Sequence, residues 1–357
     1  GVHDHAFNNL STYGNLLRLG NQKQLECTEE ELNFYRLAVK LSGAVQAKRW
    51  TKTADGKGYM YSFNGPHSLF IDTMRTCRIL LASYKLGHKL LDENDVEINM
   101  LNRAVEHGLT TAKYAVFYGK GRDKFDERGR VAHESIFNVN DGNYRCPNSQ
   151  QGFSGFTTWT RGLSWAMLGF TEFLEFLESE NPMTDQLTNV KEIFLEAAKA
   201  TCDFYIKNSA ADGIPFWDTG APQLYKLGNY TQKNSDPYNE YEPVDSSAAA
   251  IGAQGLLRLS KLLKNKSPEK AKKYELAGLK TLQTLLSDVY LSTQEDHQGI
   301  VLHANYHCPN GWDHIPKGSK IPNGESCMWG DYHMVELCLL ADKMLHGEYY
   351  TFYDYIY

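Results

Sequence analysis

One segment combines aromatic side chains with hydrogen-bonding groups in a way that suits a sugar site. Residues 150–165, QQGFSGFTTWTRGLSW, place Trp159, Arg161 and Trp165 at the start of a predicted apolar helix. An indole offers a flat face to a sugar ring and loses little conformational entropy, and a guanidinium matches the planar geometry of a carboxylate. The spacing also allows two core tryptophans and an arginine that caps the helix or lies on the surface. Both interpretations stay open at this point.

Two aspartates, Asp4 and Asp72, could supply acid–base chemistry. Asp4 lies at the start of one predicted helix and Asp72 lies in the first turns of another. Each could simply be a negative charge that stabilises a helix N-terminus. Asp72, however, follows Leu69–Ile71, and burial near a second carboxylate raises the pKa of such an acid toward the range of a general acid. Spacing alone does not tell whether the two aspartates meet.

Three further polar residues have simpler interpretations. His133 follows the glycine-rich and charged run 119–130, and a loop histidine is more often a surface residue. Asp141, in Asn-Asp-Gly, is typical of a turn, and Asp245 before Ser-Ser-Ala is typical of a helix N-cap. Trp217-Asp218 resembles a loop that runs into a pocket, and Trp329 could form a pocket wall or merely begin the last helix.

Composition and motifs exclude several classes of function. The net charge of -6 argues against a nucleic-acid or anionic-membrane partner, and no apolar run is long enough to span a membrane. The seven cysteines show no paired spacing, so we expect neither zinc nor a disulfide framework. The chain has no HExxH, GxSxG, Walker or Rossmann motif. We therefore expect no metal and no cofactor.

Helical periodicity dominates the chain. Helices are predicted at 5–20, 28–48, 69–87, 96–117, 159–179, 186–209, 245–264, 268–291 and 327–346. Long connections at 118–158, 210–244 and 292–326 separate helix pairs, and long ordered loops are usually functional. The pattern predicts one domain over residues 1–357, an all-α toroid of helical hairpins whose loops gather on one face.

A toroid of six hairpins needs twelve helices, whereas nine are predicted. The chain also opens on Gly1-Val2 without a methionine. We therefore expect that two or three N-terminal helices are missing, together with any signal peptide. This expectation leaves both the bacterial cytoplasm and the periplasm open as the location, and the oligomeric state is open as well.

Taken together, these motifs resemble the unsaturated glucuronyl hydrolases of glycoside hydrolase family 88, and more distantly the unsaturated rhamnogalacturonyl hydrolases of family 105. The motifs occur in the order of the family, namely His3-Asp4, Phe70-Ile-Asp72, His133, the block Gln150–Trp165, Asp212-Gly213 with Trp217-Asp218, Asp245-Ser-Ser, and Trp329-Gly-Asp-Tyr332. The Thr-Trp-Thr-Arg-Gly-Leu-Ser-Trp block is the specific one. The resemblance implies an (α/α)6 barrel.

The resemblance also implies roles for particular residues. Asp72 would be the catalytic acid/base and Asp4 its carboxylate partner. Five further residues would contact the substrate: His133, Gln151, Trp159, Arg161 and Trp165. Trp159 is included because it lies in the same block as Gln151, Arg161 and Trp165. The family removes a 4,5-unsaturated uronic acid from the non-reducing end of a lyase-generated oligosaccharide, which would be the partner of this chain. Asp72 would protonate C4, water would add at C5, and the resulting hemiketal would open and release the neighbouring sugar.

Two departures and three alternatives accompany this prediction. The region before Asp4, where the family keeps an aromatic wall, is absent from the sequence. We hypothesise that the run 119–130, with Lys120, Arg122 and Lys124, reshapes the outer subsite to admit a sulfated or branched sugar. The alternatives are an epimerase of the N-acylglucosamine 2-epimerase type, an inverting endo-glycosidase, and a barrel that binds glycans without catalysis. The sequence does not name the parent polysaccharide.

Overall fold

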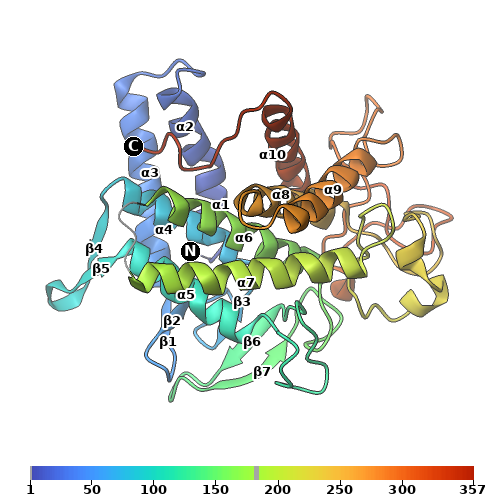
Figure 1. Ribbon diagram of the computed structural model, residues 1–357, viewed down its shortest axis with the longest axis horizontal. Coiled ribbons are helices and arrows are strands. Elements are labelled where there is room, and N and C mark those ends of the chain that lie inside the picture. Colours follow the sequence, from blue (N-terminus) through green and yellow to red (C-terminus); the bar gives the residue numbers. More distant parts are fainter. Residues whose placement is uncertain (1, 181–184) are drawn as a thin grey trace.

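The computed structural model describes residues 2–180 and 185–357, and helices dominate it (Figure 1). Their bounds are α1 His5–Asn9, α2 Asn15–Asn21, α3 Glu29–Lys48, α4 Thr73–Lys85, α5 Met100–Tyr114, α6 Thr160–Ser179, α7 Asp185–Asn208, α8 Ser246–Leu263, α9 Pro268–Leu285 and α10 Met328–Leu345. The predicted helix 5–20 is present as α1 and α2 joined by a π-helical segment, Leu10–Gly14. Each predicted helix therefore has a counterpart.

Capping residues explain where several helices begin. Thr28 and Glu31 form a reciprocal capping box at the start of α3. The side chain of Asp245 accepts hydrogen bonds from the backbone N–H groups of Ser247 and Ala248, so its prediction as an N-cap is confirmed. Asp141 accepts from the backbone N–H of Asn143, as expected of a turn residue.

Short strands replace the predicted start of two helices. Residues 69–72 and 96–99 were predicted helical, but β3 (Ser68–Phe70) and β5 (Glu97–Asn99) occupy most of these positions. β3 pairs antiparallel with β6 (Glu134–Phe137), which also pairs with β7 (Tyr144–Asn148). Two hairpins complete the strands, namely β1 (Trp50–Lys52) with β2 (Gly58–Met60), and β4 (Lys89–Leu91) with β5. The prediction failed because a short apolar run does not distinguish a strand from a helix, and the distant partner strand decides.

The helices form an inner and an outer set. The inner helices α1, α4, α6, α8 and α10 contact one another in this order, and α5, α7 and α9 each pack against the inner helix that precedes them. Helix α10 also reaches the first residues of the chain, since the rings of Phe7 and Tyr332 lie 5.9 Å apart and Asn15 donates to the Tyr332 hydroxyl. The inner helices therefore enclose a common centre.

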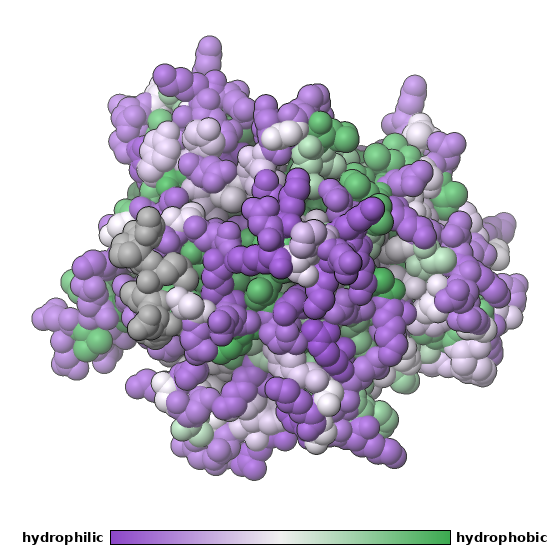
Figure 2. Space-filling view, viewed as in Figure 1, coloured by the Kyte–Doolittle hydropathy of each residue, from purple (hydrophilic) through white to green (hydrophobic). Residues whose placement is uncertain are grey.

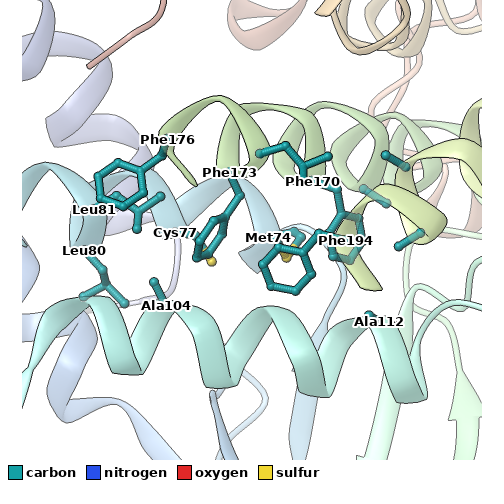
Figure 3. Packing of buried hydrophobic residues seen from close by; sticks show 14 of the residues in the cluster. Met74, Cys77, Leu80, Leu81, Ala104, Ala112, Phe170, Phe173, Phe176 and Phe194 are labelled. Atoms are coloured by element: carbon teal, nitrogen blue, oxygen red, sulfur yellow. The ribbon is translucent and has the colours of Figure 1, made fainter. Parts of the chain in front are cut away.

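Buried apolar side chains fill the space between the two sets. Figure 3 shows Met74 and Cys77 of α4 facing Phe170 and Phe173 of α6, with Phe194 of α7 beside them. Glycines allow the inner helices to approach closely. A Cβ at Gly169 would lie 3.0 Å from the carbonyl carbon of Met74, and one at Gly255 would lie 3.0 Å from the amide nitrogen of Leu168.

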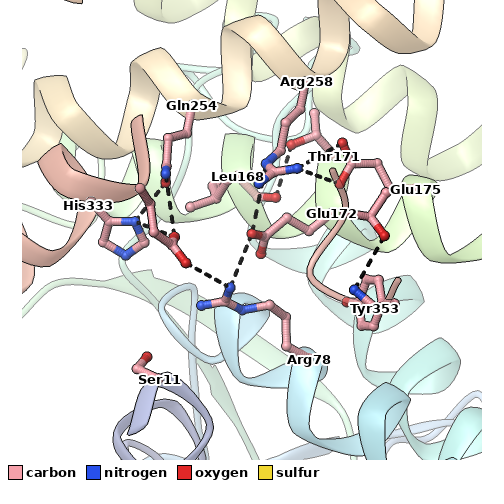
Figure 4. A network of polar contacts seen from close by, with 12 residues as sticks. Ser11, Arg78, Leu168, Thr171, Glu172, Glu175, Gln254, Arg258, His333 and Tyr353 are labelled. Atoms are coloured by element: carbon pink, nitrogen blue, oxygen red, sulfur yellow. Dashed lines mark hydrogen bonds and ion pairs between the residues drawn. The ribbon is translucent and has the colours of Figure 1, made fainter. Parts of the chain in front are cut away.

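A buried polar network joins the inner helices at their common centre (Figure 4). We call it the helix-core network, and it contains Arg78 of α4, Glu172 and Glu175 of α6, Arg258 of α8 and Glu336 of α10. Nη1 of Arg258 lies 2.8 Å from Oε2 of Glu175, and Nη1 of Arg78 lies 3.3 Å from Oε1 of Glu172. Each charge in the network thus has an opposite charge as a neighbour.

The surface visible in Figure 2 is largely hydrophilic, with apolar side chains scattered between charged ones. Among the described residues, we find no helix that combines the length and the apolar character of a membrane span.

Candidate active site

A pocket of about 600 Å³ lies where several inner helices begin. Asp4 directly precedes α1, Asp72 directly precedes α4, and Trp159 directly precedes α6. All three line the pocket, and Trp329 in the first turn of α10 lines it from the other side. Because these inner helices point their N-terminal ends at one place, residues far apart in the sequence meet there.

Asp72 is a buried acid whose side chain caps nothing. It follows β3 directly, and the neighbouring Ile71 N–H donates to the carbonyl of His133. The residue is only 5% exposed, and its carboxylate makes no capping hydrogen bond to the first turn of α4. Burial raises the pKa of Asp72, and the nearby Asp4 acts in the same direction, while Arg75 and His3 oppose them. Asp72 therefore lies at the N-terminus of α4 without capping it, and burial favours its uncharged form.

Asp4 lies in the same pocket in the opposite electrostatic state. Its carboxylate is partly exposed and accepts a hydrogen bond of 2.6 Å from Nη2 of Arg75. Partial burial by itself would raise the pKa of Asp4, but the contact with Arg75 and the proximity of His3 outweigh it, so the net pKa is lowered. The two aspartates thus meet in space, with one biased toward the protonated form and the other toward the ionised form.

His133 lies behind Asp72 and not on the surface. Its Nδ1 accepts hydrogen bonds from the backbone N–H groups of Gln150 and Gln151, at 3.0 and 3.2 Å. Burial lowers the pKa of His133 to about 3, so the ring is neutral and carries its proton on Nε2. That nitrogen lies 3.6 Å from Oδ1 of Asp72, and neither atom has a closer hydrogen-bond partner. The histidine therefore presents an N–H to the acid.

Arg161 is buried at 2% exposure, and its terminal nitrogens are already engaged. Nη1 lies 2.9 Å from Oδ2 of Asp245 and donates to the carbonyl of Asn305. Nη2 donates to Oε1 of Gln151 at 2.9 Å and to the carbonyl of Tyr306 at 2.6 Å. Arg161 is neither a surface charge nor a helix cap. It fastens the segment around Gln151 to the loop around Tyr306 on the pocket wall.

The two tryptophans of the block 150–165 are both buried and both line the pocket. The indole of Trp159 lies against His133, with ring centroids 4.7 Å apart, and Arg161 lies over it. The indole of Trp165 lies against the guanidinium of Arg75, with Cζ 4.2 Å from the ring centroid. Each tryptophan therefore holds a polar pocket residue in place as well as offering an aromatic surface.

Comparison with known proteins places this pocket in context. No protein-family model matches the chain. An unsaturated glucuronyl hydrolase of Formosa agariphila is 29% identical over 270 residues, which are 75% of this chain and 53% of that protein. Another, of Bacillus sp. strain GL1, is 27% identical over 219 residues, which are 61% of this chain and 48% of that protein. The chain spans about half the length of the curated relatives it matches.

A solved structure agrees with these relatives. The crystal structure of the unsaturated glucuronyl hydrolase from Bacillus sp. GL1, described as responsible for the degradation of glycosaminoglycan, matches with a TM-score of 0.70 at 21% identity. The match covers 99% of this chain and 77% of that one. The resemblance to the unsaturated glucuronyl hydrolases is confirmed. The expected fold class, an α/α barrel, is confirmed with it.

The sequence motifs did not indicate several residues that line the pocket. Arg75 went unremarked, although it follows Asp72 by one helical turn, and His3 was named only as part of the motif with Asp4. The signal that could have found Arg75 is a cation spaced three residues after an acid at a helix start. The exposed ring of Trp312 was also missed, because it lies in the long loop 292–326 without a recognisable motif.

The loop with Trp217-Asp218 was expected to run into the pocket, but Trp217 does not line it. Its indole N–H donates to Glu242, and the residue is buried away from the pocket lining. Asp218 instead accepts from the backbone N–H of Phe153 and so supports the loop that carries Gln151. Trp329 does form part of the pocket wall.

The run 119–130 also lies outside the pocket lining. Arg122 donates to the backbone carbonyls of Lys113 and Tyr114, and Phe125 packs against Phe156. Any effect of this run on substrate choice would be indirect, through the loop around Phe156. Across the described part of the chain, no group of three or more His, Cys, Asp or Glu residues is arranged to hold a metal ion.

Proposed function

We propose that this protein is a glycoside hydrolase that removes a 4,5-unsaturated uronic acid from the non-reducing end of an oligosaccharide by hydrating its double bond. One observation carries the proposal: a buried Asp72 with a raised pKa shares an aromatic-lined pocket with an Asp4 held as a carboxylate. Such a pair, with pKa values pushed apart, is the arrangement that assigns acid and base roles. The names of the relatives point to the same reaction.

In the first step, the protonated carboxyl of Asp72 transfers its proton to C4 of the alkene. The positive charge that develops at C5 is shared with the ring oxygen, and the nearby carboxylate of Asp4 stabilises it electrostatically. Nε2–H of His133 then faces the Asp72 carboxylate that forms, and a hydrogen bond to the charged form stabilises it.

In the second step, a water molecule adds at C5, and its proton passes to the Asp72 carboxylate, which restores the acid. The product is a hemiketal at C5. It opens to a ketone as the bond between C5 and the ring oxygen breaks, leaving a hemiacetal at C1. Collapse of that hemiacetal gives the aldehyde and releases the neighbouring sugar with its hydroxyl. Atoms and charges balance with water as the only co-reactant.

The pocket wall suits an anionic sugar. Gln151 and Arg161 bring an amide and a guanidinium to the lining, although the guanidinium donates to protein acceptors in this structure. Helices α4, α6 and α10 begin at the lining, and their N-terminal ends favour negative charge. We propose Gln151, Trp159, Arg161 and Trp165 as contacts of the terminal uronate ring, and His133 as a contact of Asp72.

The test uses a panel of lyase-generated disaccharides and the ultraviolet absorbance of their conjugated double bond. We expect the wild-type protein to abolish this absorbance with release of a free reducing sugar, and Asp72→Asn to leave it unchanged. An epimerase would convert a saturated sugar and leave the absorbance intact, and a binding barrel would retain the disaccharide without consuming it. Persistence of the absorbance with every disaccharide would refute the proposed function.

A further inference from the structure

The guanidinium of Arg75 is held from three sides at the pocket floor. Its Cζ lies 3.9 Å from the ring centroid of Phe7 and 4.2 Å from that of Trp165. Its Nη2 donates to Oδ1 of Asp4 at 2.6 Å. A guanidinium between two aromatic faces is held by cation–π contacts that strengthen when water is excluded, and Arg75 is only 9% exposed. These contacts therefore restrict the guanidinium of Arg75 to one position.

This arrangement treats the two aspartates unequally. Asp72 precedes Arg75 by three residues at the start of α4, so both lie on one side of the helix. The hydrogen bond of Arg75 nevertheless goes to Asp4, which comes from a different helix. Oδ1 of Asp72 has no hydrogen-bond partner, and Nε2 of His133 lies 3.6 Å from it.

We propose that Arg75 is the positioning residue that separates the protonation states of the two aspartates, because its contact fixes Asp4 as the carboxylate, while burial and the charge of Asp4 keep the proton on Asp72. The catalytic role of the two protonation states rests on the proposed function, whereas the protonation states themselves do not. Two carboxylates in one pocket do not both ionise readily, so the one with a permanent cation ionises first. Lysine could supply the charge, but not the planar contact with both rings.

Nε2 of His3 lies 3.5 Å from Oδ1 of Asp4 and also lowers the pKa of that carboxyl, but neither His3 nor the other nearby histidines carries a permanent charge. His3, from the segment before α1, is buried, and its pKa is lowered chiefly by burial. His133, beside β6, has its pKa lowered to about 3, again by burial. His333 of α10, which packs on Phe7 and Trp165, has its pKa lowered by burial to about 3 as well. These three histidines are neutral near pH 7, whereas Arg75 keeps its charge.

The first experiment compares pH profiles of kcat/KM for the wild type, Arg75→Met and Arg75→Lys. The acidic limb reports ionisation of Asp4 and the basic limb reports loss of the proton from Asp72. Removing the cation makes both ionisations harder, so we expect both limbs of Arg75→Met to move to higher pH. On the acidic side, kcat/KM should then fall by about 10-fold or more. Arg75→Lys should restore the limbs toward their wild-type positions.

A control separates this role from simple support of the fold. Lys89→Met removes an exposed cation in β4, away from the pocket lining, and should leave both limbs in place. If Arg75→Met lowers kcat/KM uniformly and shifts neither limb, Arg75 is only structural and the inference is wrong.

The second experiment needs no substrate, so it decides the inference even if the proposed function fails. Carbon-13 NMR of the aspartate carboxyl groups, assigned with Asp4→Asn and Asp72→Asn, follows each titration directly. In Arg75→Met we expect the titration of Asp4 to move to higher pH. In Asp4→Asn, the like charge is gone and Arg75 remains, so Asp72 should titrate at lower pH than in the wild type. An unchanged Asp72 titration in Asp4→Asn would overturn the inference, even if Arg75→Met does not fold.

Discussion

Arg75 and Arg78 lie one turn apart on α4, yet they serve two different kinds of buried charge cluster. Arg78 belongs to the helix-core network, where its guanidinium lies near Glu172 and Glu336. Arg75 belongs to the pocket, where it hydrogen-bonds to Asp4, while Oδ1 of Asp72 has no hydrogen-bond partner.

In the helix-core network each arginine and glutamate lies within 4.0 Å of an opposite charge, whereas the side chain 3.6 Å from Asp72 in the pocket is the neutral His133. Unpaired buried groups destabilise a fold and are retained where they do chemistry. The comparison indicates that substitutions in the network should change stability, and that substitutions in the pocket should change activity.

The largest effect on activity should follow Asp72→Asn. The change keeps the shape of the side chain and removes the transferable proton, so kcat should fall by about 10²- to 10⁴-fold. Loss of the ultraviolet absorbance of an unsaturated disaccharide measures it. Asp141→Asn, at an exposed turn, is the matched control and should retain wild-type activity. Near-normal turnover of the Asp72→Asn variant would show that another residue donates the proton.

The largest effect on stability should follow Arg258→Met in the helix-core network. The change leaves Glu175 buried without its main partner, and breaking a buried ion pair costs about 3–5 kcal/mol. Unfolding in denaturant at neutral pH measures the free energy. Lys320→Met breaks a solvent-exposed ion pair with Glu240 and should change the free energy of unfolding by about 0.5 kcal/mol or less. If the two substitutions lowered the free energy of unfolding equally, the expected difference between buried and exposed ion pairs would be wrong.

Asp72→Asn should also be more stable than the wild type at neutral pH. Because burial raises the pKa of Asp72 in the folded state, the folded protein binds this proton more tightly than the unfolded chain does. Stability is therefore lost as the pH rises from the ordinary pKa of an aspartate through the raised one. Asparagine abolishes this loss, so the melting temperatures of the two proteins should agree near pH 3 and diverge as the pH rises. A constant difference at every pH would contradict this reasoning.

The smallest effect should follow Trp312→Ala at the mouth of the pocket. This ring is 60% exposed and lies against Tyr306, with centroids 5.5 Å apart, so it offers a stacking surface for the outer sugar. Loss of one aromatic contact, worth about 0.5–1.5 kcal/mol, should raise KM by about 2- to 12-fold with little change in kcat. Phe34→Ala removes an equally exposed ring on α3, away from the pocket lining, and serves as the control. An identical KM for both variants would exclude the stacking role.

Local patterns were sufficient for much of the fold. Periodicity found the helices because each buries one continuous apolar stripe, and the N-cap at Asp245 was recognisable because capping depends on neighbouring residues only. The starts of α4 and α5 were predicted too early, since β3 depends on β6, some 65 residues away, and no local signal reports that pairing.

The sequence predicted which residues belong to the candidate site better than it predicted their contacts. Asp4, Asp72 and the block around Arg161 contain the residue types that sugar chemistry requires, and the structure brings them to one pocket. The sequence left open whether Arg161 binds a substrate carboxylate, caps the helix or lies on the surface, whereas in the fold it donates to Asp245 and three other acceptors. These hydrogen bonds depend on loops that are distant from Arg161 in the sequence.

The sequence by itself determined the helical class and the resemblance to the unsaturated glucuronyl hydrolases, and it pointed to Asp72 and Asp4 as candidates for acid–base chemistry. Those features follow from residue type and short-range spacing. Only the tertiary structure decided that Arg75 contacts Asp4 and that His133 faces Asp72 with a neutral ring. The physical reason is that protonation states depend on burial and on charges within a few ångströms, and folding alone sets those distances.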